Sequence, residues 1–258
     1  DRMAKQDAPF LLSLHYTAPH WPWETRAQGG VDPEVSKDIA HLDGGSIETY
    51  RTMIQEMDEG IGWVVQALRE TGILDDTLIV FTSDNGGERF SDNWPLVGGK
   101  MDLTEGGIRV PYIAHWPRGI GRPGGICAQH CMTMDWTVTM LDIAGARPPA
   151  DHVLDGVSLR ATLADASHGF PRPMHWRMKH KDQRALRDGD WKYLKVEEHE
   201  YLFNLERDAR ERANQARRDP QRLAAMRAAW ESWNAQIPPV PAEARTDLIS
   251  TLRDMPAR

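Results

Sequence analysis

Apolar runs and amphipathic stretches alternate along the first part of the chain. The run 9–16 (PFLLSLHY) is almost continuously apolar, which is typical of a strand buried on both faces of a sheet. From Ser46 to about Thr71 apolar residues recur at helical spacing, and Gly72 follows as a stop signal. A second buried strand is predicted at 77–83 (TLIVFTS). Strand, helix and strand in this order predict a βαβ unit with parallel strands.

Beyond this unit the pattern changes twice. A Gly-rich loop occupies 86–107, and a further strand and a helix are predicted at 110–116 and 135–144. After about Ser167, short β-rich runs alternate with turn residues and predict an antiparallel meander. Its predicted strands are 184–187, 191–196 and 200–205. A helix is predicted at about 220–237, where a Pro start precedes one apolar stripe.

These elements predict an α/β chain in two parts. Residues 1–167 would form part of a mostly parallel sheet flanked by helices, and residues 168–258 a smaller antiparallel sheet with one helix. A parallel strand as apolar as 9–16 needs neighbouring strands on both sides. We therefore expect the remaining strands of that sheet to lie upstream. We also expect the isolated chain to self-associate through this exposed edge.

Composition narrows the class of partner. The 258 residues carry a net charge of −7, and the basic residues of 172–230 are interleaved with acidic ones, so a nucleic-acid partner is not expected. No apolar run reaches the roughly 18 residues of a membrane span. Residues 1–7 contain no signal-peptide core. Cys127 and Cys131 are compatible with a disulfide, metal ligation or free thiols, and inert buried thiols are the favoured interpretation.

Candidate chemistry follows the two predicted strands. Asp84 and Asn85 end the strand 77–83, at the sheet edge where ligands bind in α/β folds, and offer the oxygen ligands that Ca²⁺ or Mg²⁺ prefers. Taken alone, the pair is better explained by an Asx-turn that closes the strand. His20 follows the strand 9–16 and could protonate a leaving oxygen, although a surface histidine is as plausible in isolation.

The Gly-rich loop adds two further charged groups. Lys100 follows Gly98-Gly99 and is placed to meet an anionic oxygen, although a solvated surface lysine is the simpler alternative. Glu105 and Arg109 flank a second glycine pair, and we expect them to form an ion pair that fixes the loop.

The order of these motifs resembles the sulfatase family of the alkaline-phosphatase superfamily, of the formylglycine-dependent arylsulfatase type. The resemblance runs from about residue 8 to the C-terminal helix. The segments that carry it are PFLLSLHYTAPH, MDEGIG, LIVFTSDNGG, GGK, EGGIRVP, LDGVSL, RDGDWKY and YLFNL. It departs from the family at Thr104, where a Trp is frequent, and at the helix start 134–139. Neither departure touches a matched catalytic position.

The resemblance implies roles for four residues. Asp84 and Asn85 would be ligands of a divalent metal, most commonly Ca²⁺ with Mg²⁺ or Mn²⁺ as alternatives. His20 would contact the ester and protonate the leaving alkoxide, and Lys100 would neutralise the sulfate oxygens. The family's nucleophile is a formylglycine made from Cys in C-x-P-x-R or C-x-A-x-R. Neither cysteine of this chain fits, so we expect the nucleophile upstream and no activity from these residues alone.

Three functions follow as hypotheses. The first is hydrolysis of a small-molecule or saccharide sulfate ester by the intact protein. The second keeps the fold but acts on a phosphonate or phosphate ester, and the third is a non-catalytic half-domain or pseudoenzyme. Trp21, Trp23 and Trp94 are candidates for lining a substrate entrance or for surface packing. The sequence leaves the oligomeric state and the compartment, whether periplasmic, secreted or cytoplasmic, open.

Overall fold

The computed structural model describes residues 9–28 and 45–244. It divides at Thr77 into two compact units, one with the described residues up to Thr77 and one with those from Leu78 onward. The division expected near residue 167 is a different one and stays a prediction. No helix within the described ranges is long and apolar enough to cross a membrane.

The first unit contains a long helix and the segment that precedes it. Helix α1 spans Ile47–Glu70, and the Ser46 side chain accepts a hydrogen bond from the Thr49 amide at 3.1 Å. This N-cap satisfies one of the amides that a helix start leaves unpaired. The helix predicted from Ser46 to about Thr71 is therefore confirmed.

The strand predicted at 9–16 is wrong. These residues form no strand, and all of them are exposed to solvent. A β-strand requires backbone ladder bonds to a neighbour, and an apolar sequence does not supply them. The predicted parallel βαβ unit is consequently not formed.

The second unit begins with a short two-stranded sheet. Strands β1 (Ile79–Thr82) and β2 (Tyr112–His115) confirm the strands expected at 77–83 and 110–116, and they pair antiparallel with Thr82 opposite Tyr112. Helix α3 (Thr133–Ile143) confirms the helix predicted near 135–144, and α4 spans Arg160–Ala164. One turn of helix, α2 (Glu105–Ile108), lies within the Gly-rich loop.

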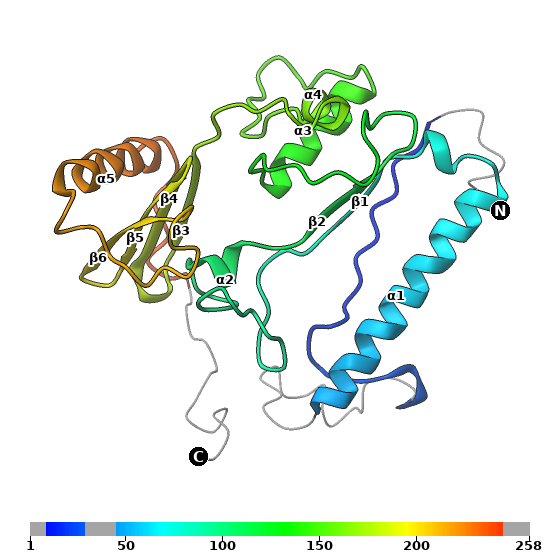
Figure 1. Ribbon diagram of the computed structural model, residues 1–258, viewed down its shortest axis with the longest axis horizontal. Coiled ribbons are helices and arrows are strands. Elements are labelled where there is room, and N and C mark those ends of the chain that lie inside the picture. Colours follow the sequence, from blue (N-terminus) through cyan, green and yellow to red (C-terminus); the bar gives the residue numbers. More distant parts are fainter. Residues whose placement is uncertain (1–8, 29–44, 245–258) are drawn as a thin grey trace. The chain divides into compact units, whose positions relative to one another are not determined.

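The predicted meander is confirmed and gains one strand. The antiparallel sheet has the order β3-β4-β5-β6. Its strands are Met174–Met178, Gln183–Asp188, Trp191–Val196 and His199–Asn204. Figure 1 shows α5 (Pro220–Asn234) along one face of this sheet, which confirms the last predicted helix.

The sheet β3–β6 has a core on each face because side chains alternate along a strand. On one face Leu186, Tyr193 and Leu202 pack against Met226 and Trp230 of α5. The opposite face is covered by the Gly-rich loop. There Leu103 and Ile108 pack against a set of strand and turn residues, Ala185, Leu194, Phe203 and Leu205. The loop that carries Lys100 therefore contributes to the core of the C-terminal sheet.

Candidate active site

Asp84 and Asn85 follow β1 directly. The Asn85 amide donates to Asp84 Oδ1 at 3.0 Å, and Ser83 Oγ donates to the Asn85 carbonyl at 3.0 Å. These contacts accompany a bend after β1, but they are not the Asx-turn that the sequence left as an alternative, because the Gly86 amide donates to the Gly107 carbonyl and not to the Asp84 carboxylate. The Asp84 carboxylate is exposed and the Asn85 side chain is half-buried. Both side chains therefore present oxygen atoms at the end of the strand.

Three glycine pairs interlock beside this bend. The Gly86 amide donates to the Gly107 carbonyl at 2.8 Å, and the Gly106 amide donates to the Val97 carbonyl at 2.8 Å. A Cβ atom at Gly86 would lie 1.8 Å from the Gly106 carbonyl oxygen, and one at Gly106 would lie 2.3 Å from the Gly98 carbonyl oxygen. Backbone packs directly on backbone here, so a side chain at either position has no room.

This packing brings Lys100 to the strand end. The Lys100 amide donates to the Gly87 carbonyl at 3.0 Å, which holds the Lys100 backbone against Gly87, the third residue after Asp84. The Lys100 ammonium lies 3.5 Å from Glu88 Oε2, and its side chain is 25% exposed. The structure thus places Asp84, Asn85 and Lys100 in one loop system, and their roles in chemistry stay a prediction.

Asn93 holds this loop system together and was missed from the sequence. Its Oδ1 accepts from the Gly87 amide at 3.2 Å, and its Nδ2 donates to the Gly87 and Gly98 carbonyls at 3.1 Å each. One side chain thereby connects the bend after β1 to the segment before Lys100. An Asn in a Gly-rich loop is a common turn former, and this is the signal that could have identified it.

His20 belongs to the first unit, where its side chain contacts the backbone of Trp21. Its Nδ1 lies 2.6 Å from the Trp21 carbonyl oxygen, which can only accept, so Nδ1 donates and carries the hydrogen. That bond fixes which ring nitrogen carries the hydrogen in the neutral imidazole. The imidazole is exposed to solvent.

The three candidate entrance tryptophans have different environments. Trp23 is 8% exposed, and a Cβ atom at Gly45 would lie 2.7 Å from its ring, so packing accounts for it. Trp21 is half-buried, and its ring contacts that of His20 in a tilted arrangement with centroids 4.8 Å apart. Trp94 is 72% exposed, and the Arg210 guanidinium lies 5.8 Å from the centre of its ring.

The expected ion pair between Glu105 and Arg109 is wrong. Glu105 is 1% exposed, and its carboxylate contacts Arg187 and Lys192 of the C-terminal sheet at 3.0 Å each. Lys192 also pairs with Glu211 at 2.8 Å. A buried carboxylate needs buried positive partners, and the sheet supplies two of them. We call Glu105, Arg187, Lys192 and Glu211 the buried charge cluster.

Neither cysteine has the properties of a nucleophile. Burial, followed by the negative charge of Asp135, raises the pKa of the Cys131 thiol to about 11, so the thiolate is scarce at neutral pH. Both cysteines are free. The interpretation of both as buried thiols needs correction, because Cys127 is exposed. A short, irregular segment on the surface cannot bury both positions.

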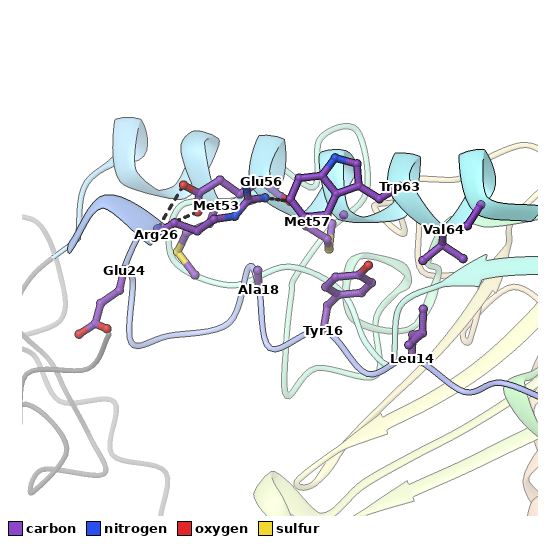
Figure 2. Close-up of a pocket in the computed structure, with 12 residues that line it drawn as sticks. Leu14, Tyr16, Ala18, Glu24, Arg26, Met53, Glu56, Met57, Trp63 and Val64 are labelled. Carbon is purple, nitrogen blue, oxygen red and sulfur yellow. Dashed lines mark hydrogen bonds between the residues drawn. The ribbon is translucent and has the colours of Figure 1, made fainter. Parts of the chain in front are cut away.

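A groove of about 550 Å³ lies in the first unit between residues 14–26 and α1. Figure 2 shows Leu14 and Tyr16 beneath the helix, with Trp63 and Val64 above them. Arg26 closes one end, where its amide donates to the Glu56 carboxylate at 3.0 Å. The lining is largely apolar and has no catalytic pattern of groups, so the groove is not a candidate for the chemistry.

The Asp84 and Asn85 side chains form only part of a binding site for a divalent metal. An exposed carboxylate and a neighbouring amide supply two hard oxygen donors. Residues 9–28 and 45–244 contain no group of three or more His, Cys, Asp or Glu side chains that could hold a metal ion. The two residues can therefore provide part of a ligand set, and the remaining ligands would come from other residues or from substrate.

A family model named Sulfatase matches residues 2–146, which is more than half of the chain. The chain belongs to the sulfatase family. This sulfatase chain is 40% identical over 165 residues to the steryl-sulfatase of Mus musculus, in a match that covers 60% of the chain and 24% of the mouse protein. The chain spans about a quarter of the length of the curated relatives that it matches.

Solved structures agree with the family. The crystal structure of Ps i-CgsB in complex with k-i-k-neocarrahexaose matches with a TM-score of 0.75 and 30% identity, covering 90% of this chain and 51% of that one. The phosphonate monoester hydrolase of Agrobacterium radiobacter matches with a TM-score of 0.54 and 27% identity, over 73% of this chain and 41% of that one. These matches confirm the predicted α/β class of the alkaline-phosphatase type.

Proposed function

We propose that the intact protein containing this chain hydrolyses a sulfate ester to an alcohol and inorganic sulfate. The observation that carries the proposal is the hydrogen bond from the Lys100 amide to the Gly87 carbonyl. It fixes the backbone of a cationic residue close in the fold to Asp84 and Asn85. A sulfate ester needs its negative oxygens neutralised before the S–O bond breaks, and a fixed cation does this without reorganisation.

Each matched residue receives one role in this proposal. Asp84 and Asn85 would bind a divalent metal, Ca²⁺, through their side-chain oxygens. When bound, that ion would supply a positive charge that stabilises negative charge on the sulfate group. Lys100 binds the sulfate oxygens from the loop side. His20, with its Nδ1 bonded to the Trp21 carbonyl, donates a proton from Nε2 to the leaving alkoxide.

The nucleophile is not among the 258 residues in this proposal. Neither Cys127 nor Cys131 lies in a formylglycine motif, and the raised pKa of Cys131 argues against a thiolate. A formylglycine from elsewhere in the intact protein would complete the site. We propose a saccharide sulfate ester as substrate, because Ps i-CgsB, named in complex with a neocarrahexaose, matches 90% of the chain.

The likeness to a phosphonate monoester hydrolase favours a second candidate function. Sulfate and phosphonate monoesters both present several anionic oxygens, so a lysine and a metal ion serve either group. The two functions differ in which ester the intact protein turns over faster. A third possibility, a protein without catalysis, predicts turnover of neither.

Substitution of Lys100 provides the direct test of the proposed sulfate ester hydrolysis. We expect Lys100→Ala in the intact protein to lower kcat/KM for a sulfated saccharide by about 10²-fold to 10³-fold, as for removal of a fixed charge-stabilising donor. Lys195→Ala is the control, because Lys195 lies on β5 and its ammonium pairs with Asp182. The measurement is the rate of release of inorganic sulfate, compared with the rate of hydrolysis of a matched phosphonate ester. Faster phosphonate release would favour the second function, and no turnover of either ester by wild type would overturn catalysis.

A further inference from the structure

The Gly-rich loop lies on a sheet face that carries an unusual number of buried polar residues. Gln183, Ala185 and Arg187 alternate along β4 on this face, and Lys192 and Leu194 lie opposite on β5. Gln183 is 2% exposed, Arg187 8% and Lys192 0%. Buried polar side chains need partners, and here all three contact residues of the loop: Gln183 contacts Met101, and Arg187 and Lys192 contact Glu105.

Gln183 contacts the two peptide groups that flank Asp102. Its Nε2 donates to the Met101 carbonyl at 2.8 Å, and its Oε1 accepts from the Leu103 amide at 2.9 Å. Nε2 also donates to the His180 carbonyl at 3.2 Å, which fixes the amide orientation. Both functions of the side-chain amide are thus committed to the turn that follows Lys100.

That turn contains a backbone conformation that needs support. Met101 has φ of 72°, in the left-handed region that residues with a Cβ atom seldom adopt. Such a conformation costs free energy and persists where neighbouring contacts hold it. The Met101 carbonyl is the acceptor of the Gln183 bond, so this contact holds the Met101–Asp102 peptide, on the far side of the Met101 Cα from Lys100.

A second anchor holds the loop at Glu105, two residues beyond Leu103. The Glu105 amide donates to Glu211 Oε2 at 2.6 Å, and the Glu105 carboxylate pairs with Arg187 and Lys192. The two negative and two positive charges of the buried charge cluster balance. Lys100 therefore lies between two sets of contacts. Asn93 and Gly87 hold the loop on one side, and the two anchors from the C-terminal sheet hold it on the other.

We propose that Gln183 is a positioning residue for Lys100, which it aims at the anionic group of the substrate by holding Met101 in its left-handed conformation. The proposal rests on the sulfate-ester function above for the identity of that group. Gln183 itself would contact no substrate. Its effect on the reaction passes through the loop, so it should disappear when Lys100 is absent.

A double-mutant cycle in the intact protein tests this dependence. We expect Gln183→Leu to lower kcat/KM for the sulfate ester by about tenfold to 100-fold, the loss that a small misplacement of a catalytic group produces. In a Lys100→Ala background the same change should have little further effect. Gln183→Glu keeps the size and the acceptor for Leu103 but loses the donor to Met101. It should show the same pattern if Gln183→Leu fails to fold.

Recovery of activity by a substitution at Met101 distinguishes a positioning role of Gln183 from a general loss of structure. Glycine adopts positive φ without cost, so Met101→Gly should recover part of the activity lost in Gln183→Leu. Leu186→Met is the matched control on the same strand, since Leu186 faces α5 on the opposite side of the sheet. It should leave kcat/KM unchanged. Additive losses in the Lys100→Ala background, or no rescue by Met101→Gly, would overturn the proposal.

Hydrogen exchange gives a readout that does not depend on turnover. The Lys100 amide, bonded to Gly87, should exchange faster in Gln183→Leu and return toward the wild-type rate with Met101→Gly. This pattern in a wild-type protein that hydrolyses no ester would retain the positioning role and reject the proposed function. Unchanged exchange in an active enzyme would reject the positioning role alone.

Discussion

His130 and Arg187 share a hydrogen bond at the margin of the buried charge cluster. Arg187 Nη2 lies 2.6 Å from His130 Nε2, and Arg187 can only donate, so His130 accepts through Nε2 and is neutral in this arrangement. Burial, followed by the positive charge of Arg187, lowers the pKa of His130 below its ordinary value of 6.5. His130 thus links the solution pH to Arg187, which pairs with Glu105.

This lowered pKa predicts a loss of stability in mild acid. Below about pH 6.5 the unfolded chain binds a proton at His130 before the folded chain does, so the free energy of unfolding falls as pH drops toward the folded pKa. Above pH 6.5 the contribution is fully present. We expect His130→Gln to have a flatter stability profile between pH 7 and pH 5, measured by urea unfolding.

The difference between the two proteins isolates His130. Burial also lowers the pKa of His175, which stacks on Trp233, but His175 is present in both. Parallel pH profiles for the wild type and His130→Gln would show that the bond to Arg187 does not control this dependence.

At the scale of elements, Asp135 organises the start of α3. Its carboxylate is 0% exposed, accepts from the Met132 and Val157 amides at 2.7 and 3.0 Å, and pairs with Arg172 at 2.7 Å. A short helix is marginal by itself, so these tertiary contacts determine where it begins. The helix start that departs from the family pattern is therefore well anchored.

Removing this carboxylate should be costly. We expect Asp135→Ala to lower the free energy of unfolding by about 3–5 kcal/mol, because it leaves the Arg172 charge buried without its partner. Asp142→Ala, which breaks an exposed pair with Arg160, should cost about 0–1 kcal/mol. Midpoints of urea unfolding give both values. Equal losses for the two variants would contradict the importance of burial.

At the scale of the whole molecule, the run 9–16 leaves apolar surface exposed. Leu11 is 74% exposed, Leu12 50% and Leu14 50%. In the first unit, Trp63 of α1 adds a further exposed aromatic at 65%. Contiguous apolar surface of this kind promotes association with other apolar surfaces.

We expect the 258-residue chain by itself to self-associate at micromolar concentration. Leu11→Lys combined with Leu12→Glu should reduce the association, because it places charges in the exposed run without changing its net charge. Light scattering against protein concentration measures the effect. A wild-type chain that stays monomeric across that range would contradict the expectation.

The sequence by itself determined the features that depend on local periodicity and composition. Helices α1, α3 and α5, and the strands of the meander apart from β3, follow from apolar spacing and turn residues because those signals act within a few residues. The family and the candidate residues Asp84, Asn85 and Lys100 follow from motifs in order.

Only the tertiary structure decided which segments meet. Gln183 lies about 80 residues from Met101, and Lys192 lies 87 residues from Glu105, so no local pattern relates them. The same limit explains the two errors at 9–16 and at Glu105. An apolar run becomes a strand only if another strand bonds to it, and a buried carboxylate pairs with the cation that folding places beside it.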